Sequence, residues 1–238
     1  LGDSMIFSLV SAWVMAEPIR GPRVQGPGSR VVGGTVVDIG SYPFASAILF
    51  STDLFVTSSH YCGGSIITAR YVLSAAQSTN QIRFRVGSAN ANSGGTVYNV
   101  ELITTHPSYN QWTLENDVAI VRSTPAIAMV PNVVVSTVLS EQLRHAQVRI
   151  VNQWLCMMHY GSIGWHVSEN MICSGLMGVG GSDQCDGDAG SPVVHIGSTA
   201  NIIVGIRSFG FQCGLPFFPG VGARVSRFHA WIIATTSS

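Results

Sequence analysis

From Val31 onward, short apolar segments alternate with clusters of Gly, Ser, Asn and Pro. The apolar segments are rich in Val, Ile and Phe and are too short for core helices, so each predicts a β-strand. These segments cover residues 45–50, 65–67, 71–75, 83–87, 97–104, 118–122, 147–151, 171–173, 193–195, 202–208 and 222–225. Only residues 227–234 have helical character. Many short strands at this spacing predict an all-β protein, either a barrel or a sandwich.

The N-terminal region has a different pattern. Residues 6–16 form an apolar run that follows Met5 and ends near the small side chain of Ala16. We therefore predict a signal peptide over residues 1–16, with its core at residues 5–16; the run is too short to span a membrane. Residues 17–30 are rich in Pro, Gly and Arg, which predicts a propeptide. The expected product is a secreted, extracellular protein.

The chain carries few charges. Hydrophobic residues make up 46% of it and charged residues 10%, and the formal net charge is zero. This balance gives no reason to expect nucleic acid or a membrane surface as a partner. All twelve basic residues are arginine. Arginine keeps its charge above pH ~12 and lysine only to about 10.4, so the bias suits an alkaline fluid such as a caterpillar gut lumen; drift in nucleotide composition is the alternative.

Four motifs stand in an informative order: CGGSI at 62–66, SAAQS at 74–78, ENDVAI at 115–120 and CDGDAGSP at 185–192. Together they resemble the chymotrypsin/trypsin family of secreted serine proteases. The stretch RVGSANANSGG at 85–95 is similar to trypsins of moth larvae in particular. The resemblance implies a trypsin-like domain over residues 31–238. It would contain two antiparallel six-stranded barrels, at about 31–130 and 131–238, and a short C-terminal helix.

The same resemblance implies an incomplete catalytic triad. The triad aspartate matches Asp117, whereas Gln77 stands at the histidine position and Ala189 at the serine position. An amide offers no nitrogen that accepts a proton near neutral pH, and a methyl group cannot attack a carbonyl. Loss of the base or the nucleophile lowers turnover by about 10⁶ in a serine protease. The backbone N–H groups of the oxyanion hole match Gly187 and Ala189.

The substrate pocket matches the family better. Asp183 corresponds to the carboxylate that recognises Arg or Lys at the floor of the trypsin pocket, through a charge-assisted pair. Ser208, Gly210 and Gly220 correspond to the pocket wall. The resemblance therefore implies a ligand that contains arginine, either a peptide or a protease inhibitor.

The motif RVVGG at 30–34 resembles the activation site of the family. Cleavage after Arg30 would free the amino group of Val31, which would insert beside Asp188. Because all three residues are present, the zymogen switch is expected to persist.

The five cysteines form an odd set. The resemblance implies the disulfides Cys156–Cys173 and Cys185–Cys213, which suit an oxidising compartment. Cys62 lacks its family partner because that position is Ser78, so it is either a buried thiol or the site of an intermolecular bridge. No histidine–cysteine spacing indicates zinc, and no cofactor is expected.

Relative to the family, the sequence lacks a strand before residue 141. The second barrel is then short of one strand unless residues 133–139 fill its place. A missing strand would leave unpaired edges, which domain swapping or a partner's strand would cover.

Three hypotheses follow. The first is a non-catalytic trypsin homologue that binds arginine-containing peptides, protease inhibitors or a partner protease. The second is a trypsin-like endopeptidase whose substitutions are artefacts of sequencing or engineering. The third is a poorly folding by-product without a binding function.

Overall fold

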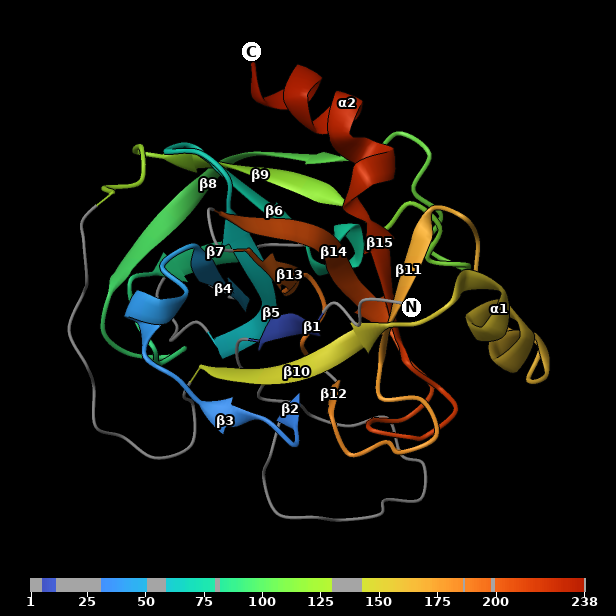
Figure 1. Ribbon diagram of the computed structural model, residues 1–238. Helices are drawn as coiled ribbons and strands as arrows, with labels where there is room; N and C mark the ends of the chain where they lie inside the picture. The colour runs from blue at the N-terminus through green and yellow to red at the C-terminus, as the bar shows by residue number, and fades with distance from the viewer. Residues whose placement is uncertain are drawn as a thin grey trace.

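A computed structural model describes residues 6–11, 31–50, 59–79, 82–129, 143–185, 187–197 and 200–237. These residues form two antiparallel, barrel-like sheets and two α-helices (Figure 1). The all-β fold class and the C-terminal helix, both predicted from the sequence, are confirmed. Within the described ranges no helix is long and apolar enough to cross a membrane.

The first barrel is closed. Its strands follow the order β4-β5-β6-β9-β8-β7, and β7 pairs with β4. Their bounds are Ala45–Phe50 (β4), Ser59–Ile66 (β5), Tyr71–Ser74 (β6), Ile82–Val86 (β7), Thr96–Thr105 (β8) and Ala119–Thr124 (β9). Strand β7 shows why these segments become strands, because Ile82, Phe84 and Val86 are buried and alternate with two half-exposed arginines. This period of two places one face of the strand in the core.

The second sheet also follows a barrel-like path, β1-β13-β14-β15-β11-β10, and β1 pairs with β10 as well. The bounds are Ile6–Ser11 (β1), Arg144–Ile150 (β10), Met171–Gly175 (β11), Pro192–Ile196 (β13), Asn201–Phe209 (β14) and Gly220–Arg224 (β15). The short strand β3 (Thr35–Val36) pairs with the outer edge of β10.

Strand β1 corrects one expectation from the sequence. The sequence predicts a second barrel short of one strand, but β1 lies between β10 and β13 and supplies the sixth (Figure 1). The same residues were predicted as the core of a signal peptide, and that assignment stays a prediction. A signal-peptide core and a short β-strand can have the same short apolar run, so the pattern does not separate them. Residues 133–139, the other candidate for this strand, lie outside the described residues, as do residues 1–5 and the propeptide 17–30.

A side-chain cap and the Cys156–Cys173 disulfide hold helix α1 (Gln153–Gly161), and packing holds helix α2 (Val225–Thr236). Helix α1 begins where the Asn152 side chain accepts a hydrogen bond from the backbone N–H of Leu155, which satisfies one of the unpaired donors of the first turn. Helix α2 buries Phe228 and Ile232 against the first barrel and β14. These two residues are one helical turn apart, so a single apolar stripe holds the helix in place. Two short 3-10 segments, Ile39–Ser41 and Ala76–Ser78, and a two-stranded sheet of β2 (Val31–Val32) and β12 (Asp183–Gln184) complete the described elements.

Candidate functional site

The loop that resembles the nucleophile loop connects the two barrels. The backbone N–H of Gly63 in β5 donates to the carbonyl oxygen of Ala189 at 2.8 Å. The next residue, Gly190, has φ +81°, and a Cβ there would overlap the carbonyl oxygen of Gly63. Only glycine accommodates both constraints. The loop is therefore held against the first barrel, and the Ala189 methyl group packs against the apolar cluster of that barrel.

Gln77 lies at the centre of a polar network at the barrel interface. Its backbone N–H and its side-chain Nε2 donate to the two carboxylate oxygens of Asp117, at 2.9 and 2.6 Å. The same Nε2 donates to the carbonyl oxygen of Ser208 at 2.9 Å, and Ser208 Oγ donates to Asp117 at 2.6 Å. Burial raises the pKa of Asp117, and the hydrogen bonds from Ser208 and Gln77 oppose that shift. The amide therefore anchors the buried carboxylate but offers no proton acceptor to a substrate.

Two of the expected pocket residues, Asp183 and Gly220, lie close together beside Arg207, which none of the sequence motifs indicated. Asp183 is buried and accepts a hydrogen bond from the backbone N–H of Gly214 at 3.1 Å. Arg207 is buried as well, with only 4% of its surface exposed. Its Nη1 donates to the carbonyl oxygens of Phe209 and Val221. The one signal for it in the sequence is a lone arginine within the apolar segment of β14, NIIVGIRSF.

The predicted activation residues are only partly within the described chain. Arg30 lies outside it. Strand β2 (Val31–Val32) pairs with β12 (Asp183–Gln184), so the start of the protease-like domain lies beside Asp183. Asp188 is fully buried, and its carboxylate accepts a hydrogen bond from the backbone N–H of Cys185 at 2.8 Å. Gly187, in the same turn, has φ +85°.

The cysteines pair as the resemblance implies. Disulfides join Cys156 to Cys173 and Cys185 to Cys213. Cys62 is a buried free thiol. Burial raises the pKa of Cys62 to about 12, and the hydroxyl of Ser78 opposes the shift. No group of metal-binding side chains was found among the described residues.

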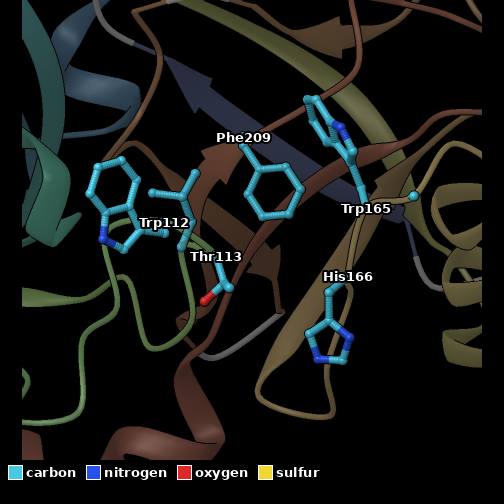
Figure 2. A pocket seen from close by; sticks show the side chains of 7 residues that line it. Trp112, Thr113, Trp165, His166 and Phe209 are labelled. Atoms are coloured by element: carbon cyan, nitrogen blue, oxygen red, sulfur yellow. The ribbon is translucent and has the colours of Figure 1, made fainter.

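Phe209, whose carbonyl oxygen accepts a hydrogen bond from Arg207, also lines an aromatic hollow of about 300 Å³. Its lining residues are Trp112, Thr113, Leu114, Gly164, Trp165, His166 and Phe209. Figure 2 shows Phe209 between the indole rings of Trp112 and Trp165, which come from two different loops. The Phe209 and Trp165 rings are 5.8 Å apart. Trp112 is 87% exposed, so the hollow presents apolar surface to the solvent.

Two antiparallel barrels, with these residues at their interface, define a serine-protease domain of the chymotrypsin class. A family profile described as "Trypsin" matches residues 31–138 and 130–232. The chain is similar to "Trypsin CFT-1" of Choristoneura fumiferana, at 44% identity over 86% of this chain and 90% of the relative. It is also similar to "Trypsin, alkaline A" of Manduca sexta, at 43% over 85% and 90%, and to "Achelase-1" of Lonomia achelous, at 38% over 69% and 91%. The chain therefore belongs to the trypsin family.

Proposed function

We propose that this chain is a trypsin-family protein that does not hydrolyse peptide bonds. The proposal rests on Gln77, whose amide takes up the hydrogen bonds to Asp117 and Ser208. Neither that amide nor the methyl group of Ala189 can take the role of base or nucleophile. Loss of the triad leaves about 10³ to 10⁴ of rate enhancement over water from binding and the oxyanion hole, which is negligible for digestion.

A non-catalytic role would then depend on binding. We propose that the cleft takes a polypeptide, either an arginine-containing peptide or a protease inhibitor that normally targets an active relative. The aromatic hollow supports this, because exposed indole rings supply contact area for a polypeptide partner. The buried carboxylate of Asp183 supports the choice of an arginine-containing ligand, because a carboxylate pairs with a guanidinium group.

We also propose that the protein is secreted as a zymogen-like precursor and acts in an alkaline gut lumen. The absence of lysine supports this setting, as does the name of the relative "Trypsin, alkaline A". Expression in insect cells tests secretion: the protein should accumulate in the medium, and retention in the cells would contradict the proposal.

The test of inactivity uses the purified full chain and an arginyl p-nitroanilide substrate, before and after cleavage at Arg30. We expect no hydrolysis above background in either form. Hydrolysis that disappears in an Asp117→Ala variant would contradict the proposal, whereas a contaminating trypsin would be unaffected by that substitution. Resequencing the transcript tests the endopeptidase alternative, which requires codons for His at 77 and Ser at 189.

The same material tests the by-product alternative. A folded domain of this kind should unfold cooperatively. A broad, non-cooperative thermal transition would favour the by-product and remove the basis for a binding function.

A further inference from the structure

We propose that Arg207 is a built-in occupant of the specificity pocket, so that the pocket is closed to arginine ligands while Arg207 remains in it. This deepens the proposed binding function, on which it rests, by naming what controls access to Asp183. The proposal depends on three observations: the position of the guanidinium group, its burial beside a carboxylate, and the two glycines that surround it.

The position of the guanidinium group is given by the pocket walls. A Cβ added to Gly220 would lie 2.7 Å from Arg207 Nη1 and 2.8 Å from Asp183 Oδ1. A Cβ added to Gly210 would lie 2.6 Å from Arg207 Nη2. The guanidinium group therefore lies between the two glycines and beside the pocket carboxylate. By resemblance to the family, an open pocket would hold the arginine side chain of a substrate at this position.

The electrostatics favour this arrangement. Arg207 and Asp183 are 4% and 2% exposed. A buried guanidinium is tolerated when a carboxylate compensates its charge and acceptors take its N–H groups. Two carbonyl acceptors, Phe209 and Val221, belong to the pocket wall. Burial raises the pKa of Tyr160, and the charges of Arg207 and Asp183 act on it in opposite directions, so both charges lie close to the same phenol.

The backbone holds Arg207 in this place. Its N–H donates to the carbonyl oxygen of Ser191 at 2.9 Å, and its own carbonyl accepts from the N–H of Gly190 at 2.8 Å. These two hydrogen bonds hold the backbone of Arg207 against the nucleophile-like loop. Its side chain is directed into the pocket. A ligand that needs Asp183 must first displace a buried, charge-compensated group.

The experiment is calorimetric titration of benzamidine, an arginine mimic, into the full chain and into an Arg207→Val variant. Arg207→Val leaves the buried Asp183 carboxylate without the neighbouring guanidinium charge, a costly state that a bound benzamidine cation relieves. We therefore expect Arg207→Val to bind benzamidine about 100-fold or more tightly than the unmodified chain. Adding Asp183→Ser to that variant should abolish the gain. Arg83→Val, which removes an arginine from β7, is the matched control and should bind as the unmodified chain does.

Equal affinity of the unmodified chain and Arg207→Val, or no binding by either, would overturn the proposal. A measurement on chains that keep Arg207 covers the case in which the variant fails to fold. Asp183→Ser alone should lower the melting temperature, because it leaves the guanidinium uncompensated. Benzamidine at a concentration that saturates an active trypsin should not raise the melting temperature of the unmodified chain. The opposite result in either measurement would also overturn the proposal. Hydrolysis by the unmodified chain, in contrast, would contradict the proposed inactivity and leave the binding comparison intact.

Discussion

The buried pair Cys62 and Ser78 allows a direct test of the fold. Cys62 packs in the apolar cluster of the first barrel, and Ser78 is fully buried beside it. The Ser78 hydroxyl acts on the pKa of the thiol. Within the described ranges, however, Ser78 Oγ has no hydrogen bond of normal geometry. We predict that Ser78→Cys forms a disulfide with Cys62 and raises the stability of the protein.

The magnitude follows from the length of the closed loop. A disulfide that closes about 15 residues contributes ~3 kcal/mol in the chain-entropy treatment. For a domain of this size, 1 kcal/mol moves the melting temperature by about 2–4 °C, so we expect a rise of about 6–12 °C. Replacing the hydroxyl also removes a buried polar group without a partner, an effect of about 1–3 kcal/mol. The Ser78→Ala variant isolates that second contribution.

The assay combines thiol titration under denaturing conditions with thermal unfolding, with and without reductant. The unmodified chain should titrate one thiol, and Ser78→Cys none. The gain in melting temperature over Ser78→Ala should vanish in reductant. Two free thiols in the variant, or a gain that survives reduction, would refute the reasoning.

Three further predictions concern pH, catalysis and the N-terminal strand. The pKa of Cys62 is about 12 in the folded protein, whereas an ordinary thiol titrates near ~8.5. Between these pH values only the unfolded state loses the thiol proton. The free energy of unfolding therefore falls by up to ~1.4 kcal/mol per pH unit. Cys62→Ala should therefore show a shallower loss in urea unfolding from pH 8 to 11, and parallel curves would contradict this. In chains cleaved after Arg30, Gln77→His with Ala189→Ser should hydrolyse an arginyl substrate weakly, and adding Arg207→Val should raise kcat/KM about 100-fold by opening the pocket; no change would count against it. Leu9→Pro should lower the melting temperature, since β1 pairs on both sides and proline removes a ladder hydrogen bond. An unchanged melting temperature would contradict this prediction.

Much of the fold followed from the sequence because the motifs fix the order of the strands. The network around Gln77 was also accessible, since two short motifs place positions 77 and 117 in one site. Arg207 was not accessible: residues 205–208 of β14 are all buried, so there is no alternation to show that one of them points into a pocket. Strand β1 was not predicted for a related reason. A short apolar segment does not indicate which strands it will pair with, here β10 and β13. Long-range pairing, not local preference, decided both cases.

The six residues of strand β1 are also part of the predicted signal peptide. They cannot both be removed with a signal peptide and complete the second barrel. If residues 1–16 left with a signal peptidase, β10 and β13 would be separated by an open seam. Each edge of that seam would present unpaired backbone groups, which attract extended segments of other chains. A chain that keeps residues 6–11 closes this gap with its own strand. Strand β1 therefore determines whether the second barrel is closed by its own chain or open to a strand from another chain.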